Sequence, residues 1–137
     1  MAFVFGKKSK ENLKGVHPAL VKIATRALEL SPIDFRVSCG VRTMQQQKAM
    51  VARGVSKTMK SKHLVQSDGY AHAIDIVALP NGVVSWDFSH YRTIAGCFKQ
   101  AAEEIGTEAG VTCTWGGDWA TLRDGPHFQI DVKKRLK

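Results

Sequence analysis

Four residues in three short segments of the chain have the types and spacing that suit metal chemistry. His63 ends a Ser-Lys-His segment, Asp75 lies between two isoleucines, and Asp124 precedes His127 by three residues. Two histidines and one carboxylate form a usual catalytic zinc set, because they leave the fourth position of the metal open for water. A further carboxylate beside that water can act as its general base. These residues therefore predict a metal-dependent hydrolase.

The sequence around Asp75 and around His127 supports the prediction of a metal site. Asp75 lies in an apolar segment, and a carboxylate buried there needs a partner such as a metal, an arginine or backbone N–H groups. His127 follows a Gly-Pro pair, so Asp124 and His127 can share one pocket if that turn folds back. A lone histidine is more often structural, but its occurrence beside the other three residues favours a metal ligand.

Other polar residues are weaker candidates. His72 and Asp68 are minor alternative ligands, and strand alternation places the side chain of His72 on the face opposite Asp75. His17 and His90 lie at expected helix starts and are predicted to be structural.

Arg42 comes just after an expected strand. It is either a solvated turn residue or a group that binds a substrate carboxylate or stabilises oxyanion charge. The segment 115–119, a glycine turn between two tryptophans, is either the wall of a cleft or an ordinary hairpin.

The pattern of apolar residues predicts an α+β fold with a small, mostly antiparallel sheet packed with helices. Helical periodicity predicts helices over 18–30, 44–53 and 89–105, with Thr43 capping the second and Gly54 and Gly106 ending the second and third. Segments 1–16 and 55–70 have no clear period and are expected to be irregular. Strands are predicted over 35–39, 73–79, 83–86, 111–115 and 128–132.

The length of the chain predicts a single domain over residues 1–137, and its composition makes that domain basic. The formal net charge is +8, which favours a polyanionic partner such as nucleic acid, a cell-wall polymer or a membrane surface. Part of this charge lies at the two ends, which are either solvated or attach the protein to an anionic surface. The basic end residues are Lys7, Lys8, Lys10, Lys14, Lys133, Lys134, Arg135 and Lys137.

The three cysteines, Cys39, Cys97 and Cys113, form no CxxC pair and are odd in number, which favours free buried thiols and a reducing compartment. No apolar run is long enough to cross a bilayer, and the N-terminus lacks the apolar stretch of a signal peptide. The sequence thus predicts a protein that is made in the cytoplasm and is not inserted in a membrane.

The order of these motifs resembles the zinc peptidases of the D-Ala-D-Ala carboxypeptidase (VanY-like) family. The resemblance is greatest to its phage endolysin branch, the L-alanyl-D-glutamate peptidases, and covers almost the whole chain. Besides the Ser-x-His, Ala-x-Asp and Asp-x-x-His motifs, the matching segments are 3–6, 12–18, 26–30, 40–43 with Gln46, and 115–119.

The resemblance implies a Hedgehog/DD-peptidase-like fold and a residue for each role. His63, Asp75 and His127 would be the Zn²⁺ ligands, and Asp124 the catalytic acid/base. Arg42 would stabilise the substrate or the oxyanion, and Ser61 would support the site.

The resemblance also implies a substrate and a setting. The substrate would be the peptide stem of peptidoglycan, cut at the L-Ala-D-Glu bond to cause host cell lysis. The enzyme would accumulate in the host cytoplasm and reach the periplasm and cell wall after holin permeabilises the membrane. The sequence does not specify the oligomeric state, for which a monomer is the default expectation.

One departure from the family pattern is a longer segment between the first two ligands. The additional residues lie around 66–70 and leave the substrate contacts of this loop, and the alternatives Asp68 and His72, open. An insertion of this kind in a loop costs little entropy.

Three other functions remain as alternatives. They are a D-Ala-D-Ala carboxypeptidase of the same fold, a non-catalytic, metal-stabilised wall-binding module, and a small nucleic-acid-binding domain that would leave the His/Asp set without a role.

Overall fold

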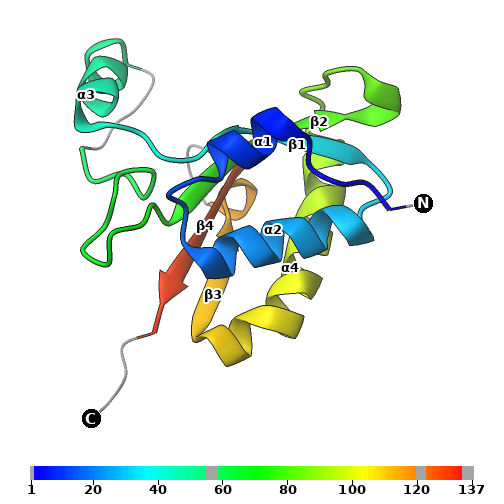
Figure 1. Ribbon diagram of the computed structural model, residues 1–137. Coiled ribbons are helices and arrows are strands. Elements are labelled where there is room, and N and C mark those ends of the chain that lie inside the picture. The colour runs from blue at the N-terminus through cyan, green and yellow to red at the C-terminus, as the bar shows by residue number, and fades with distance from the viewer. Residues whose placement is uncertain (1, 55–58, 120–122, 134–137) are drawn as a thin grey trace.

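A four-stranded antiparallel sheet organises the computed structural model, which describes residues 2–54, 59–119 and 123–133 (Figure 1). The strands are β1 (Asp34–Cys39), β2 (Ala73–Leu79), β3 (Val111–Trp115) and β4 (His127–Val132), in the order β1-β2-β4-β3. This arrangement confirms the predicted α+β class and the predicted antiparallel sheet.

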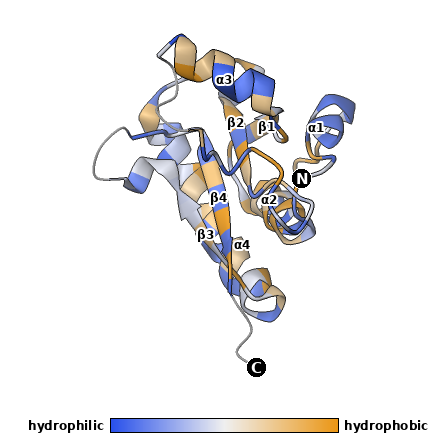
Figure 2. Ribbon diagram, turned by 90° about the vertical axis from the view of Figure 1, so that its left-hand side faces the viewer, coloured by the Kyte–Doolittle hydropathy of each residue, from blue (hydrophilic) through white to orange (hydrophobic). Residues whose placement is uncertain are grey.

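Two helices, α2 (Pro18–Leu30) and α4 (Phe88–Ala109), cover one face of the sheet and form the core with it (Figures 1 and 2). Proline at the first helical position and the His17 ring, which accepts a hydrogen bond from the Ala19 N–H, begin α2 where the sequence predicts it. The Phe98 and Phe128 rings stack at 3.8 Å between α4 and β4. Each fully buried side chain of this size contributes roughly 1.5–3 kcal/mol.

Alternation along the strands separates this core from the opposite face of the sheet. Ile74, Ile76 and Phe128 are fully buried in the core, whereas Asp75 and His127 have the opposite strand parity. Asp75 pairs with His127 across the ladder between β2 and β4. The two polar side chains therefore share the face that α2 and α4 leave uncovered.

A β-bulge at Ser38 changes the pairing at the end of β1. Val37 pairs with Ile76, but the next pair is Cys39 with Asp75, so Ser38 is the extra residue. A bulge of this kind shifts the following side chain to the other face of the sheet. Cys39 is consequently placed on the face that carries Asp75.

A short helix, α1 (Lys7–Asn12), lies along the outer edge of β1, in the segment that was expected to be irregular. Val37 donates its N–H to Ser9 Oγ (3.1 Å) and accepts a hydrogen bond from Asn12 Nδ2 (2.9 Å). Side chains of α1 thus satisfy backbone groups of an edge strand. The sequence KKSKEN has no apolar period, which explains why the pattern did not predict this helix.

Two predicted elements differ from the structure. Gly106 does not end α4, which continues to Ala109 and stops at Gly110, where φ is +73°. The predicted strand over 83–86 is only an isolated bridge between Ser85 and Ala78, because the preceding residues form a 3₁₀ turn (Pro80–Gly82).

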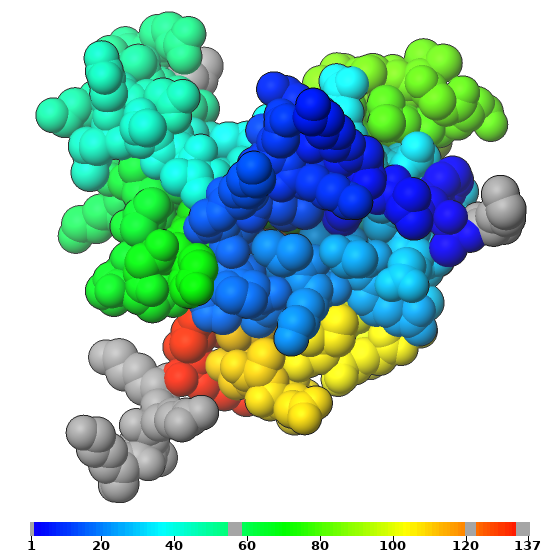
Figure 3. Space-filling view, in the orientation of Figure 1, coloured from blue at the N-terminus to red at the C-terminus, as the bar shows by residue number. Residues whose placement is uncertain are grey.

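The helix α3 (Met44–Ala52) agrees with the prediction and stands apart from the helical layer (Figures 1 and 3). Thr43 and Gln46 form a capping box at its start, and Gly54 has a positive φ after its end. No helix among the described residues is long and apolar enough to cross a membrane. The basic C-terminal residues after Lys133 lie outside the described part of the chain.

Candidate metal centre

Three separate segments bring His63, Asp75 and His127 together, as the sequence predicted. Asp75 Oδ1 lies 3.3 Å from His63 Nε2 and 3.4 Å from His127 Nδ1. His63 is 2% exposed and His127 7% exposed, so both rings are buried beside the carboxylate. A carboxylate between two imidazole nitrogens is the arrangement that the metal hypothesis requires.

Two buried atoms at the centre of this cluster have no hydrogen-bond partner within the described part of the chain. They are His63 Nε2 and Asp75 Oδ1, which face one another without hydrogen-bond geometry. Unpaired polar atoms are rare in protein interiors because their desolvation is costly. A bound cation would satisfy both atoms, so these residues fit a metal ion.

The two histidines offer different ring nitrogens, and a hydrogen bond fixes each choice. His63 Nδ1 lies 2.9 Å from the Gly40 carbonyl, which can only accept, so Nδ1 carries the proton and Nε2 faces Asp75. His127 Nε2 lies 2.8 Å from Gln129 Oε1, which leaves Nδ1 directed to Asp75. Such hydrogen bonds set the tautomer and the ring orientation of metal-binding histidines.

The charges of the cluster shift its pKa values strongly in the metal-free protein. Burial lowers the pKa of His63, but the adjacent Asp75 carboxylate and Cys39 raise it by a larger amount, so that the pKa is about 10. Burial raises the pKa of Asp75, but the two histidines lower it well below its usual range. In the metal-free protein the His63 ring is therefore protonated at neutral pH and forms a 3.3 Å ion pair with Asp75 that lacks hydrogen-bond geometry.

Asp124 joins the cluster because the turn before His127 folds back. Oxygen atoms of Asp75 and Asp124 and a ring nitrogen of His127 all lie within 4.8 Å of one another. The turn is held by hydrogen bonds from Trp115 Nε1 to the Gly125 carbonyl (2.7 Å) and from the Ile76 N–H to the Pro126 carbonyl (3.0 Å). The fold of the Gly-Pro turn thus brings Asp124 close to His127 and Asp75.

The environment of Asp124 suits proton transfer. Asp124 is exposed as a residue, but partial desolvation of its carboxyl group and the neighbouring Asp75 carboxylate raise its pKa. A raised pKa brings a carboxyl group nearer to neutral pH, where a general acid/base works best.

Arg42 is partly buried beside the cluster, with its side chain 10% exposed, rather than a solvated turn residue. Its Nη2 lies 3.7 Å from Asp75 Oδ2, and its Nη1 donates to Gln47 Oε1 at 2.8 Å. Its backbone N–H donates to the His63 carbonyl (2.8 Å). Gln47, fully buried in α3, is a supporting residue that the sequence interpretation missed; its one signal was a glutamine five residues after Arg42.

The comparisons with known proteins agree with this geometry. Residues 1–133 match the family described as phage L-alanyl-D-glutamate peptidase. The chain belongs to this peptidase family. An L-alanyl-D-glutamate peptidase of Escherichia phage T5 is 39% identical over 138 residues, which cover 98% of this chain and 92% of the relative. The L-alanyl-D-glutamate peptidase of Listeria phage A118 is 36% identical, over 82% of this chain and 37% of its own length.

A solved structure extends the likeness to three dimensions. The crystal structure of the Serratia marcescens L-Ala D-Glu endopeptidase ChiX is 45% identical to this chain, with a TM-score of 0.83. The alignment covers 95% of this chain and 91% of that structure. The predicted resemblance to the L-alanyl-D-glutamate peptidases is confirmed.

In the present chain, the two minor alternative ligands, Asp68 and His72, bind each other and do not join the central cluster. His72 Nε2 lies 2.7 Å from Asp68 Oδ2, and His17 Nε2 lies 3.8 Å from the same oxygen. The His17 and His72 rings pack edge to face, with their centroids 5.3 Å apart. These residues connect the inserted loop to the start of α2.

The segment after β3 is a 3₁₀ turn (Gly116–Asp118) rather than an ordinary hairpin, and its two tryptophans pack differently. Trp115 is buried and packs over Gly117, where a Cβ atom would overlap the indole ring. The Trp119 ring lies against His127, with centroids 5.0 Å apart, and so borders the site. Ser61 supports the cluster by accepting the His63 N–H in a 3.1 Å hydrogen bond.

Proposed function

We propose that this protein is a zinc-dependent peptidase that hydrolyses the L-Ala-D-Glu bond in the peptide stem of peptidoglycan. The observation that carries the proposal is the pair of buried, unpartnered atoms, His63 Nε2 and Asp75 Oδ1, beside His127 Nδ1. The family of the chain and the names of its relatives support the choice of the bond.

Three residues would hold the zinc ion. They are His63 through Nε2, Asp75 through Oδ1 and His127 through Nδ1, a nitrogen and oxygen set that zinc accepts. Zinc bound there would lower the pKa of a water molecule toward neutrality and polarise the scissile carbonyl.

Asp124 and Arg42 would carry out the remaining chemistry. Asp124 accepts a proton from the attacking water and then donates it to the leaving nitrogen of D-Glu, which its raised pKa favours. The Arg42 guanidinium, held between Gln47 and Asp75, stabilises the negative charge that develops on the carbonyl oxygen.

The charge of the protein supports an anionic, wall-associated substrate. The formal net charge of +8 favours accumulation at a polyanionic polymer. We further propose that the protein acts as a monomer, after holin has opened the membrane, and thereby lyses the host.

A digest of purified Gram-negative peptidoglycan tests the metal-dependent activity. Soluble peptide fragments are measured by mass spectrometry for the untreated protein, for the chelated protein, and after zinc is added back. The proposal expects release that chelation abolishes and zinc restores. A folded, zinc-loaded protein that binds the wall without releasing peptides would instead support the wall-binding module.

A further inference from the structure

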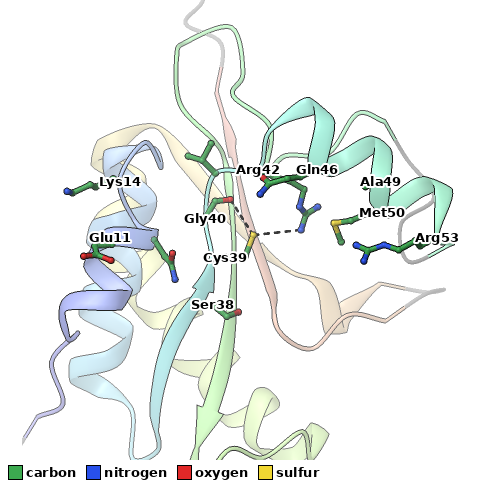
Figure 4. Close-up of a pocket in the computed structure, with 12 residues that line it drawn as sticks. Glu11, Lys14, Ser38, Cys39, Gly40, Arg42, Gln46, Ala49, Met50 and Arg53 are labelled. Carbon is green, nitrogen blue, oxygen red and sulfur yellow. Dashed lines mark hydrogen bonds between the residues drawn. The ribbon is translucent and has the colours of Figure 1, made fainter.

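A cleft of about 570 Å³ lies between α1 and α3 (Figures 3 and 4). Its floor is the end of β1 and the residues that follow, including Cys39 and Gly40, and one wall is α3 with Met50 and the following Arg53. The residues at the opposite rim, Glu11 and Lys14, come from α1 and its C-terminal end. None of these rim residues has a role in the metal centre.

The inner end of this cleft is lined by two residues that contact the candidate metal centre, although none of the candidate ligands lines the cleft itself. Arg42 and Cys39 both line the cleft. Arg42 Nη2 lies 3.7 Å from Asp75 Oδ2, and Cys39 Sγ lies 3.8 Å from His63 Nδ1. A peptide whose scissile bond lies at the metal centre can therefore extend into the cleft past Arg42.

The wall formed by α3 presents cationic and apolar groups to this path. Figure 4 shows the Arg53 guanidinium directed back along α3 toward the cleft, beyond Met50. Arg53 is exposed, and none of the ion pairs between described residues includes it. It is thus a guanidinium available to a ligand, at the opposite end of this wall from Arg42.

Only the part of the substrate on the leaving-group side of the scissile bond carries negative charges that complement this cationic wall. The D-glutamyl residue provides the leaving nitrogen and, since the stem continues through one of its carboxyl groups, keeps the other as a carboxylate. The residues after it end in a further carboxylate, whereas the L-alanyl side carries a neutral acyl group. Guanidinium groups bind carboxylates with paired, charge-assisted hydrogen bonds.

We propose that the cleft between α1 and α3 binds the D-glutamyl, leaving-group side of the stem, with Arg53 binding a carboxylate beyond the scissile bond. This proposal rests on the proposed peptidase function and adds the direction in which the substrate lies. Arg53 is then a residue that determines specificity for anionic stems.

A pair of synthetic substrates tests the proposal. One is N-acetyl-L-Ala-γ-D-Glu-L-Lys with two free carboxylates, and the other has both carboxylates converted to amides. We expect Arg53→Gln to lower kcat/KM on the dicarboxylate about tenfold or more, mainly through KM. On the diamide the variant should equal the wild type. Lys22→Gln, which removes the same charge from an exposed site on α2 outside the cleft, should leave both values unchanged.

A binding measurement covers the case in which the diamide is cut too slowly to measure. The leaving-side product γ-D-Glu-L-Lys is used as an inhibitor, and its Ki should rise about tenfold in Arg53→Gln and stay the same in Lys22→Gln. Equal losses on both substrates, or an unchanged Ki, would overturn the assignment of Arg53. A wild-type protein that cuts neither substrate would contradict the peptidase function itself, which is a different outcome.

Discussion

Hydrogen bonds from two neighbouring residues determine which ring nitrogen of His63 and of His127 faces Asp75. The Gly40 carbonyl holds the proton of His63 on Nδ1, and Gln129 holds that of His127 on Nε2. Residue types and spacing were enough to predict that His63, Asp75, Asp124 and His127 lie close together. The supporting contacts of Gly40 and Gln129 depend on strand register, which the sequence pattern does not specify.

Replacing Asp124 by asparagine separates proton transfer from metal binding. Asp124→Asn keeps the size of the side chain but cannot accept the proton, so kcat should fall by about 10²–10⁴-fold. Zinc content, measured by atomic emission, should stay at the wild-type level. The control Asp118→Asn, an exposed aspartate in the same connection, should keep full activity. Wild-type turnover in Asp124→Asn would remove the proposed acid/base.

Gln129 is expected to set the zinc affinity without touching the metal. Gln129→Leu removes the acceptor of His127 Nε2–H and should weaken zinc binding by about 10–100-fold, measured by competition with a chromophoric chelator. Gln129→Glu keeps an acceptor and should restore most of the affinity. Equal affinities in the wild type and Gln129→Leu would contradict this role.

Zinc binding should release a proton. The pKa of His63 is about 10 in the metal-free protein, so its ring is charged at neutral pH and must lose a proton to bind a cation. Zinc affinity should therefore rise with pH, and calorimetry in two buffers of different ionisation enthalpy should detect the release. Binding enthalpies that are the same in both buffers would contradict the prediction.

The same proton affects the stability of the metal-free protein. Because the folded-state pKa of His63 is raised from 6.5, its stabilisation is complete below pH 6.5 and is lost as the pH rises toward 10. The Tm of the chelated protein should fall over this range, and the zinc-loaded protein should show a smaller change.

At the scale of elements, periodicity correctly predicted those helices and strands whose positions are determined by packing in the apolar core. The strand over 73–79 and the helices beginning at Pro18 and Met44 were located correctly because their apolar residues or caps face fixed partners. Helix α1 and the bulge at Ser38 were not predicted, because both depend on the edge of β1 rather than on a local pattern. The bulge and α1 nevertheless form the floor and one rim of the cleft.

Two glycines of α4 test the packing of this helix against β3. A Cβ at Gly106 would lie 2.8 Å from the Val111 carbonyl, whereas a Cβ at Gly96 would contact nothing within 4 Å. Gly96→Ala should stabilise the protein by about 0.5–1 kcal/mol through helix propensity. Gly106→Ala should destabilise it despite the same propensity gain, as measured by urea unfolding. Equal stabilisation in both variants would show that the close approach is absent.

At the scale of the whole molecule, one small domain combines a candidate metal centre, a cleft and a strong positive charge. The formal net charge of +8 predicted a polyanionic partner but did not identify it. The buried His/Asp cluster makes a purely nucleic-acid-binding domain a poor explanation, because such a domain has no use for unpartnered ligand atoms. The family of the chain points to the cell wall as the polyanionic partner.

The most direct test of the central proposal is the identity of the residue at the amino terminus that the protein creates. Purified peptidoglycan is digested with the zinc-loaded enzyme, the new amino groups are labelled, and the labelled residue is identified after acid hydrolysis. We predict D-Glu as the labelled residue, with no labelling above background for Asp124→Asn. Release of free D-Ala without labelled D-Glu would contradict the account and assign the protein as a D-Ala-D-Ala carboxypeptidase.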